Sequence, residues 1–248
     1  MKKSSIQNTY QTAVITKIEQ ETPIVKSFYL DTKVKAKPGQ YVMVWIPRVN
    51  EKPFGVASTN PFMLSIANIG SFTQKVHELK VGDKLSWRGP YGTSFTLKGE
   101  KLLLVAGGYG VVPLHLLASQ VVPEKRKNIT VIIGAKTAKH LPFVDKFKEL
   151  GCKVKVATDD GSKGFKGFTT KLAQELLGKE TFDQAYTCGP NIMMETLAQV
   201  CHKHDLPCQV SFEAFFKCGG LGLCGECNYK GHLVCQEGPV FDSSLLLK

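Results

Sequence analysis

The segment at residues 102–122, LLLVAGGYGVVPLHLLASQVV, limits the possible fold more than any other part of the chain. It is long and uncharged like a membrane span, but Gly107, Gly108, Gly110 and Pro113 interrupt its middle. A buried strand, a glycine turn and a helix with proline in its first turn explain this pattern better than a lipid-facing helix. We therefore expect a strand–turn–helix unit here and no membrane partner.

The same alternation of strand and helix continues to residue 215. Further predicted strands are NITVIIGAK, KVKVATDDG, QAYTCGP and CQVSFEAFF, and the helices between them are PFVDKFKELG, TTKLAQELLG and NIMMETLAQVCHKHD. This order predicts a doubly wound parallel sheet of the α/β class.

Residues 1–98 have a different pattern. Short β-branched and aromatic runs (QTAVITKIEQ, VKSFYLDT, YVMVWIP, PFMLSIAN, DKLSWRG) are separated by the turn-forming stretches KPGQ, VNEKP, NIGS and KVGD. About six strands at such spacing predict a small antiparallel β barrel, and SFTQKVHELKVG predicts one short helix. The expected domains are a barrel at 1–98, an α/β domain at 99–210 and a cysteine-rich domain at 211–248.

Charge and cysteine usage narrow the function. The net charge is +11, but the lysines are scattered and form no run of five, so we expect a solvated surface and no nucleic-acid partner. The segment MKKSSIQNTYQTAVI has no apolar core of a signal peptide, which predicts a cytoplasmic location. Clustered thiols are then better interpreted as metal ligands than as disulfides.

Three glycine-containing turns follow predicted strands: GGYGVVP, TDDGSKGFKG and TCGPNIMM. Ligands of open parallel sheets bind beyond the carboxyl ends of the strands, and helix N-termini favour phosphates. These turns therefore predict a nucleotide site, although each alone is also an ordinary turn. GGYGVVP is not GxGxxG, which disfavours a standard dehydrogenase.

Two stretches of the predicted barrel, EKPFGVAS and GSFTQK, could also contact a ligand. Lys52 could neutralise a phosphate, Phe54 could lie against a ring, and Gly70 to Thr73 could offer N–H groups and a hydroxyl to a pyrophosphate. The same residues are common in strands and turns, so the residues alone leave both interpretations open.

Four cysteines near the C-terminus have the spacing C-x5-C-x2-C-x7-C, at Cys218, Cys224, Cys227 and Cys235. Zinc sites usually show two CxxC knuckles, and here there is one. The glycine-rich loop is closer to the plant-type [2Fe–2S] spacing. The spacing favours an iron–sulfur cluster over zinc, and zinc over disulfides.

Together and in this order, these motifs resemble the ferredoxin–NADP reductase superfamily. With WRGPYG and the tail KCGGLGLCGEC…VCQEGPVF, the chain is most similar to the electron transfer subunits of class B dihydroorotate dehydrogenases. The resemblance implies three sets of binding residues. Those for FAD are Lys52, Pro53, Phe54, Gly55, Gly70, Ser71, Phe72 and Thr73. Those for the nicotinamide nucleotide are Gly107, Gly108, Gly110, Pro113, Asp159, Asp160, Cys188, Gly189 and Pro190. The [2Fe–2S] ligands are Cys218, Cys224, Cys227 and Cys235.

Three departures from the family pattern affect these assignments. Gly55 stands where a serine hydroxyl usually faces the flavin, which bears on the tuning of hydride transfer. One glycine, Gly219 or Gly220, is additional between the first two cysteines. Tyr109 replaces a smaller residue in the glycine turn and could crowd the nicotinamide.

The function that the resemblance implies is electron transfer in pyrimidine biosynthesis. Electrons would pass between NAD and an FMN-containing dihydroorotate dehydrogenase catalytic subunit through FAD and the cluster, in a heterotetramer, with no catalytic acid or base. NADP stays open in place of NAD. Two alternatives also stay open: an NAD(P)H-oxidising subunit of a hydrogenase or ferredoxin–NADP oxidoreductase complex, and a zinc-stabilised non-catalytic binding module.

Overall fold

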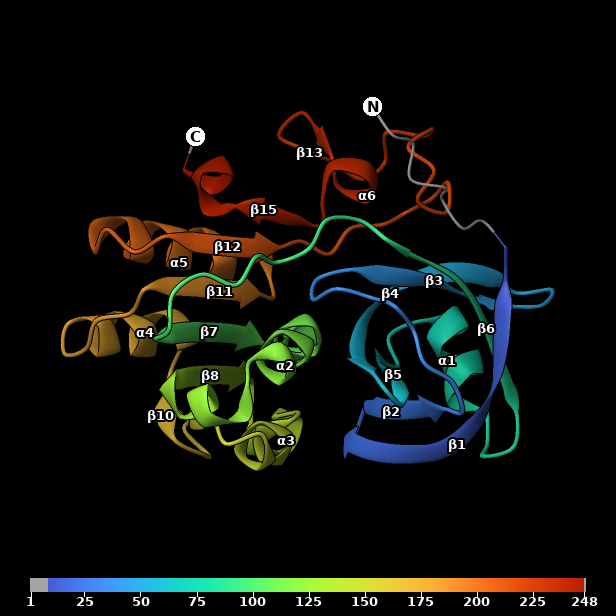
Figure 1. The fold of residues 1–248 in the computed structure, drawn as a ribbon, viewed down its shortest axis with the longest axis horizontal. Helices are drawn as coiled ribbons and strands as arrows, with labels where there is room; N and C mark the ends of the chain where they lie inside the picture. Colours follow the sequence, from blue (N-terminus) through green and yellow to red (C-terminus); the bar gives the residue numbers. More distant parts are fainter. Residues whose placement is uncertain (1–8, 248) are drawn as a thin grey trace.

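The computed structural model describes residues 9–247 and contains two lobes connected by residues 92–101, with a C-terminal segment lying across their junction (Figure 1). Residues 1–8, which belong to the predicted barrel domain and to the stretch judged to lack a signal peptide, lie outside the described residues, as does Lys248.

The first lobe is the predicted antiparallel barrel. Its closed strand order is β1-β2-β5-β4-β3-β6. The strands are β1 (Gln11–Thr22), β2 (Val25–Leu30), β3 (Tyr41–Ile46), β4 (Asn50–Thr59), β5 (Phe62–Ala67) and β6 (Lys84–Tyr91), and α1 (Ser71–His77) is the predicted short helix. Large side chains such as Phe28, Phe62 and Trp87 fill the interior and are at most 1% exposed.

One predicted turn of the barrel is wrong in position. VNEKP was expected to connect two strands, but the chain turns at residues 47–49 and β4 already begins at Asn50. Asn50 pairs with Ile46 and Gly55 with Tyr41, so the strand pairing continues through the residues predicted as a turn. Pairing with β3 therefore outweighs the local turn preference of Asn and Pro.

The second lobe is the predicted doubly wound sheet, in the order β10-β9-β8-β7-β11-β12-β15. The strands β7 (Leu102–Gly107), β8 (Ile129–Ala135), β9 (Lys153–Thr158), β10 (Phe165–Lys166), β11 (Gln184–Cys188) and β12 (Cys208–Ser211) are parallel, and β15 (Val240–Asp242) is antiparallel. The segment at 102–122 forms β7, the turn η1 (Gly108–Gly110) and α2, as predicted.

Helices cover both faces of this sheet. α2 (Val111–Gln120) and α3 (Val144–Glu149) share one apolar core with the sheet, and α4 (Thr169–Leu177) and α5 (Asn191–Lys203) share the other. The short 3-10 turns η2 (Pro123–Asn128) and η3 (Ala138–His140) flank β8. None of the helices in residues 9–247 has both the length and the hydropathy to cross a bilayer.

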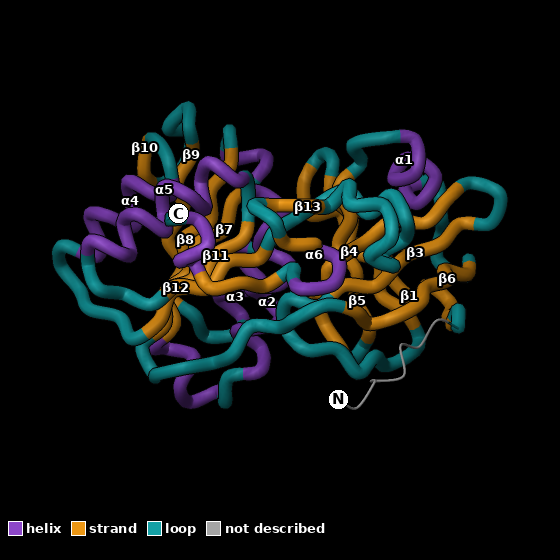
Figure 2. The backbone as a smooth tube through the Cα atoms, turned by 90° about the horizontal axis from the view of Figure 1, so that it is seen from above, coloured by secondary structure: helices purple, strands orange, loops and turns teal. Residues whose placement is uncertain are grey.

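The C-terminal segment leaves β12 and returns to it. The predicted last strand, CQVSFEAFF, is shorter than expected: it ends at Ser211, and the Phe212 N–H donates to the Pro239 carbonyl at 2.9 Å. The segment then contains β13 (Asn228–Tyr229), β14 (His232–Leu233), α6 (Val234–Glu237), β15 and η4 (Ser243–Leu246). Figure 1 shows β13 and α6 above the junction of the two lobes, and the view from above in Figure 2 shows them between the lobes.

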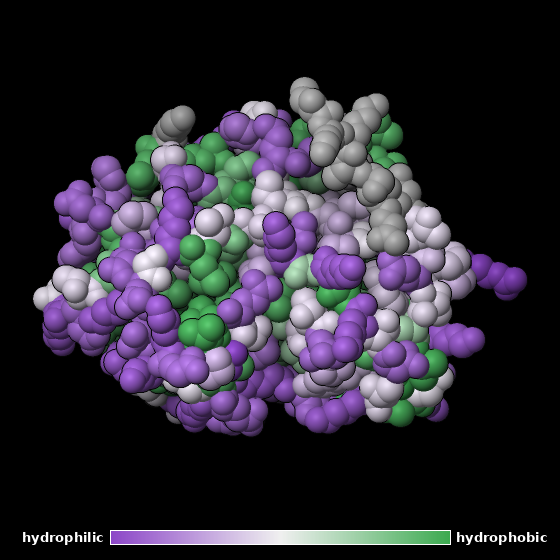
Figure 3. All heavy atoms as spheres, viewed as in Figure 1, coloured by the Kyte–Doolittle hydropathy of each residue, from purple (hydrophilic) through white to green (hydrophobic). Residues whose placement is uncertain are grey.

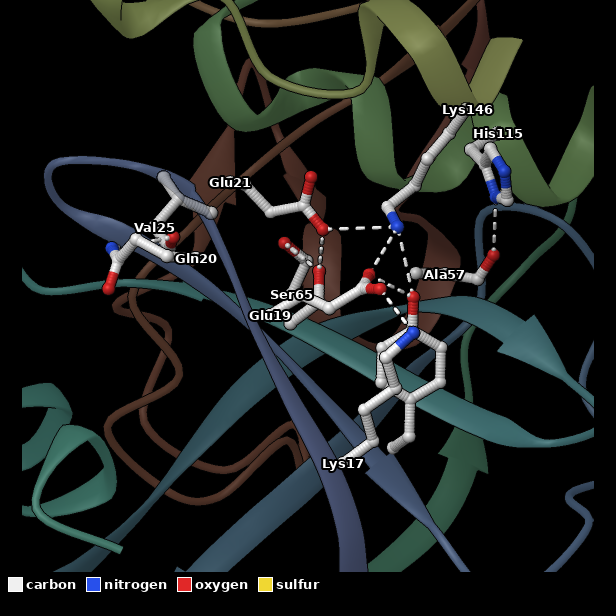
Figure 4. A network of polar contacts seen from close by, with 11 residues as sticks. Lys17, Glu19, Gln20, Glu21, Val25, Ala57, Ser65, His115 and Lys146 are labelled. Atoms are coloured by element: carbon white, nitrogen blue, oxygen red, sulfur yellow. Dashed lines mark hydrogen bonds and ion pairs between the residues drawn. The ribbon is translucent and has the colours of Figure 1, made fainter. Parts of the chain in front are cut away.

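Polar contacts also join the lobes directly. Lys146 on α3 reaches Glu19 on β1 at 2.5 Å and the Tyr29 hydroxyl on β2 at 2.9 Å (Figure 4). On α2, the His115 ring lies 2.9 Å from the Ala57 carbonyl of β4. Hydrophilic side chains are otherwise scattered over the face shown in Figure 3, in keeping with the dispersed lysines of the sequence.

Candidate functional site

A cleft of about 210 Å³ lies where the barrel, the parallel sheet and the C-terminal segment meet. It is mostly apolar, as expected for a cofactor site. Its walls include Tyr41, Pro53, Phe54, Gly55 and Thr73 from the barrel, Tyr109, Pro113 and Cys188 from the sheet, and Phe212, Glu213 and Phe216 from the C-terminal segment.

The barrel wall contains part of the predicted flavin set. The Phe54 and Phe72 rings stack with their centroids 6.1 Å apart, and this contact packs α1 against β4. The Thr73 hydroxyl accepts the Gly70 N–H at 3.0 Å and donates to the Gly70 carbonyl at 2.9 Å, so the turn before α1 is held in one shape. Lys52 lies apart from the cleft wall: its ammonium is 4.1 Å from the Phe215 ring centroid.

The sheet wall brings two of the predicted glycine turns together. A Cβ on Gly107 would lie 2.7 Å from Pro190, and one on Gly110 would lie 2.2 Å from the Cys188 carbonyl oxygen. Glycine is therefore required for this close approach of two backbones. The prediction that TCGPNIMM lies beside GGYGVVP is confirmed.

The third turn, after β9, lies outside the cleft wall. Asp160 accepts the Ser162 N–H at 2.9 Å and the Ser162 hydroxyl at 2.6 Å, and these bonds lower the pKa of Asp160. Asp159 is exposed, and its carboxylate has no hydrogen-bond partner among the described residues. Asp160 thus stabilises the turn, and Asp159 remains available to a ligand.

Among the cleft residues that the sequence reasoning missed, two have ionisable side chains. Glu213 lines the cleft and is exposed to solvent there, while the protein atoms around its carboxyl partly desolvate it and raise its pKa. Its only sequence signal is one acidic residue within the apolar run VSFEAFF. Cys188 lies nearby at 1% exposure, and burial and the Glu213 charge raise the pKa of its thiol well above the usual value.

Tyr41 is the second of these. It is 4% exposed, lines the cleft, and packs on Phe216 with ring centroids 4.9 Å apart. Its hydroxyl donates to the Cys235 carbonyl at 3.1 Å. Nothing in the sequence near Tyr41 indicates this contact, because the two residues are 194 positions apart.

The four predicted metal ligands lie in residues 218–235, here called the cysteine loop, which runs into α6 at Cys235; they form two pairs, Cys218 with Cys224 and Cys227 with Cys235. Cys227 and Cys235 are buried, and Cys224 is exposed. No group of three or more His, Cys, Asp or Glu side chains in residues 9–247 is placed to hold a single metal ion. Two pairs suit a two-iron cluster, in which each iron takes two protein ligands, better than one tetrahedral zinc.

Backbone N–H groups of the loop point at the sulfurs. The Leu223 N–H lies 3.4 Å from the Cys218 Sγ, and the Cys235 N–H lies 3.5 Å from the Cys227 Sγ. Burial opposes ionisation of Cys218, but N–H groups led by that of Leu223 lower the pKa of its thiol to about 6. Burial and the adjacent Cys227 raise the pKa of Cys235 to about 11. The N–H groups at the Cys218 and Cys227 sulfurs suit an anionic, sulfur-ligated cluster.

Known protein families match the parallel-sheet lobe and the C-terminal segment. The family described as oxidoreductase NAD-binding domain matches residues 104–199. The iron-sulfur cluster binding domain of dihydroorotate dehydrogenase B matches residues 213–247. A probable dihydroorotate dehydrogenase B (NAD(+)) electron transfer subunit of Methanocaldococcus jannaschii is 46% identical over 92% of this chain and 87% of its own. The chain belongs to the family of dihydroorotate dehydrogenase B electron transfer subunits. A family member of the same description in Thermococcus kodakarensis is 39% identical over 96% of this chain and 98% of its own.

Solved structures support the same fold. An NADH-dependent reduced ferredoxin-NADP oxidoreductase, described for flavin-based electron bifurcation, superposes with a TM-score of 0.82 and 30% identity over 94% of this chain and 88% of its own. The ferredoxin reductase of carbazole 1,9a-dioxygenase has a TM-score of 0.70 at 22% identity over 80% of this chain and 67% of its own, which shows the fold alone.

These matches confirm the predicted family, fold class and oxidoreductase function in electron transfer. They support FAD, NAD and an iron–sulfur cluster as the cofactors. Membership of a family of electron transfer subunits also implies a catalytic partner subunit.

Proposed function

We propose that this subunit passes electrons between NAD and an FMN-containing dihydroorotate dehydrogenase catalytic subunit, in pyrimidine biosynthesis. FAD would lie in the cleft and a [2Fe–2S] cluster in the cysteine loop. The observation that carries the proposal is that the cleft and the cysteine loop share one residue, Tyr41. Tyr41 lines the cleft, and its hydroxyl donates to the carbonyl of Cys235 at 3.1 Å. One buried side chain thus separates the two sites.

On the barrel side, the flavin would lie against β4 and α1. Pro53, Phe54 and Gly55 form the wall that would face its ring, and the turn held by Thr73 would receive its pyrophosphate. Gly55 leaves room here, because the nearest atom to an added Cβ is Val112 Cγ1 at 3.5 Å. The full proposed set is Lys52, Pro53, Phe54, Gly55, Gly70, Ser71, Phe72 and Thr73, although Lys52 would have to leave the Phe215 ring to reach a phosphate.

On the sheet side, the nicotinamide nucleotide would lie along the two packed glycine turns. The proposed residues are Gly107, Gly108, Gly110, Pro113, Asp159, Asp160, Cys188, Gly189 and Pro190. The Tyr109 ring lines the cleft at this point and would have to share it with the nicotinamide. The Glu213 carboxyl lines the same cleft, is exposed to solvent there, and would face the bound nucleotide.

In the cysteine loop, Cys218 and Cys224 would ligate one iron, and Cys227 and Cys235 the other. When bound, FAD exchanges two electrons with a nicotinamide and single electrons with an iron–sulfur cluster. The loop's N–H groups would stabilise the negative charge on the sulfurs, and the apolar walls of the cleft would keep water away from the reacting atoms.

The surface around Cys224 suits a partner subunit. Leu221 and Leu223 beside it are 48% and 79% exposed, and exposed apolar side chains next to a redox centre favour protein docking. We propose that the catalytic subunit covers this surface in a heterotetramer. The cytoplasmic location and the boundaries at 1–98, 99–210 and 211–248 stay predictions.

Purification under argon, with iron, sulfide, zinc and flavin measured in one sample, tests the proposal. We expect flavin bands, about two iron atoms per chain and no zinc. Cys224→Ser should lose most of the iron, whereas Cys152→Ser, which changes a buried thiol outside the loop, should keep it. A colourless zinc protein would contradict the proposal.

A second candidate partner is favoured by one observation. The structure with the TM-score of 0.82 is an NADH-dependent reduced ferredoxin-NADP oxidoreductase, so the same scaffold occurs in a ferredoxin-linked complex. Co-purification distinguishes the two functions: we expect an FMN protein that oxidises dihydroorotate, and recovery of a ferredoxin-linked or hydrogenase subunit would favour the alternative.

A further inference from the structure

Arg88 on β6 is a buried cation whose hydrogen bonds cross from the barrel to the cysteine loop. It is 6% exposed. Its Nε and Nη2 donate to the two carboxylate oxygens of Glu51 at 2.9 and 2.5 Å. The same Nη2 donates to the Gly219 carbonyl at 2.5 Å, and Nη1 donates to the Tyr91 hydroxyl at 3.1 Å.

Glu51 and its neighbours fix the orientation of this guanidinium. The Tyr10 hydroxyl donates to Glu51 Oε2 at 2.7 Å, so the carboxylate is itself held on the second side. A bidentate arginine–carboxylate pair has one defined geometry, and an ammonium group cannot reproduce it. The Nη2 atom is therefore aimed at one place on the cysteine loop.

The loop is shaped to receive this contact. Gly219 has φ of 66°, and a Cβ there would lie 2.1 Å from Glu51 Oε1 and 2.5 Å from Arg88 Nη2. Gly220 has φ of 79°, and its Cβ would lie 2.8 Å from the Tyr41 hydroxyl. Both residues directly follow Cys218, so the barrel contacts the loop at the first predicted ligand.

We propose that Arg88, oriented by Glu51, is the positioning residue that seats the iron–sulfur loop on the barrel beside the cleft. This rests on the proposed function, because the loop is taken to hold the cluster. The additional glycine between Cys218 and Cys224 has a role in this arrangement: a loop without side chains at 219 and 220 can press its backbone against Arg88 and Tyr41. Arg88 also neutralises the Glu51 carboxylate next to the loop, so its removal would leave a negative charge there that disfavours the reduced, more negative state of the cluster.

Arg88→Gln in the full-length, anaerobically purified protein tests this role. Partners of metal ligands typically contribute about 10- to 100-fold in metal affinity. We therefore expect about 10-fold faster loss of iron to a chelator, a lower midpoint potential for the remaining cluster and an altered EPR spectrum, with FAD retained. Arg88→Lys should restore part of the potential but not the retention of iron. Arg126→Gln is the matched control, because Arg126 is also an arginine that donates to backbone carbonyls, two of them at 2.7 Å, but within the other lobe.

A second pair of variants tests the contact from the loop side, without removing the buried arginine. Gly219→Ala should lose iron as Arg88→Gln does. Gly231→Ala should keep it, because Gly231 has a similar φ of 88° in the same segment but no atom within 4 Å of an added Cβ. Wild-type iron retention and potential in both Arg88→Gln and Gly219→Ala would overturn the positioning role. Absence of iron from the wild-type protein would instead contradict the proposed function.

Discussion

Replacing Glu19 by Gln should weaken the junction of the two lobes in a pH-dependent way. Glu19 accepts a hydrogen bond from Lys146 of α3 at 2.5 Å and one from Tyr29 at 2.6 Å, and it also pairs with Lys17 (Figure 4). Because Lys146 belongs to the parallel-sheet lobe and Glu19 to the barrel, this carboxylate joins the walls of the cofactor cleft.

The size of the effect follows from the ionisation of Glu19. Burial opposes the charge, but hydrogen bonds led by that of Lys146 lower the pKa of the carboxyl from 4.5 to about 2. This difference corresponds to about 3 kcal/mol in favour of the folded, ionised state. The side chain is 29% exposed, so solvent screening reduces the expected loss in Glu19→Gln to about 2 kcal/mol at pH 7.

The pH dependence has a defined sign. The folded-state pKa lies below the unfolded-state value, so the stabilisation is complete above about pH 5 and is lost as the pH falls toward 2. The difference in unfolding free energy between wild type and Glu19→Gln should therefore fall to about half its value by pH 3. Urea unfolding followed by circular dichroism at several pH values measures it.

Glu100→Gln provides the control, because Glu100 pairs with Lys125 at the surface of one lobe, and this change should have little effect at any pH. A destabilisation by Glu19→Gln that is the same at pH 7 and pH 3 would refute the reasoning, as would one below about 0.5 kcal/mol at pH 7.

Three further predictions concern the cleft and the thiols. Gly110→Ala should destabilise the protein by more than about 2 kcal/mol and abolish nucleotide binding, because its Cβ would overlap the Cys188 carbonyl. Thermal unfolding measures the loss of stability and NADH titration the loss of binding. Normal NADH binding would contradict the close packing of the two turns. Gly55→Ser should fold and keep its FAD, because its Cβ would meet Val112 at an ordinary 3.5 Å, while the rate of flavin reduction by NADH should change. Loss of flavin on gel filtration would contradict the room for a side chain at position 55. Cys152 should resist iodoacetamide at pH 8 in the native protein, because burial raises the pKa of its thiol to about 11; rapid labelling seen by mass spectrometry would disagree.

The parts of the fold that the sequence predicted correctly depend on local patterns. The alternation of apolar strands with helices indicated the parallel sheet, and the glycine turns GGYGVVP and TCGPNIMM indicated which loops meet at its edge. Turn position in the barrel was less predictable, since Asn50 and Pro53 favour turns locally but are held in β4 by pairing with β3.

The residues that join the lobes and the cysteine loop could not be predicted from local patterns. Arg88 lies 131 positions from Gly219, and Tyr41 lies 194 positions from Cys235. Each belongs to an ordinary strand sequence, and only the closed barrel brings it beside the loop. Glu213 had a weak signal, a single charge in an apolar run, whose meaning depends on the cleft that forms around it.

The antiparallel strand β15 has a consequence for how this protein can be divided. It follows the cysteine loop but pairs with β12, so the loop begins and ends on the same edge of the parallel sheet. A chain truncated after residue 217 would lose the cysteines and also leave β12 as a bare edge, open to pairing with other chains. The iron–sulfur segment is therefore an insertion between two paired strands, β12 and β15, and cannot be removed as an independent C-terminal domain. Transplanting it onto a related reductase would require moving its closing strand with it.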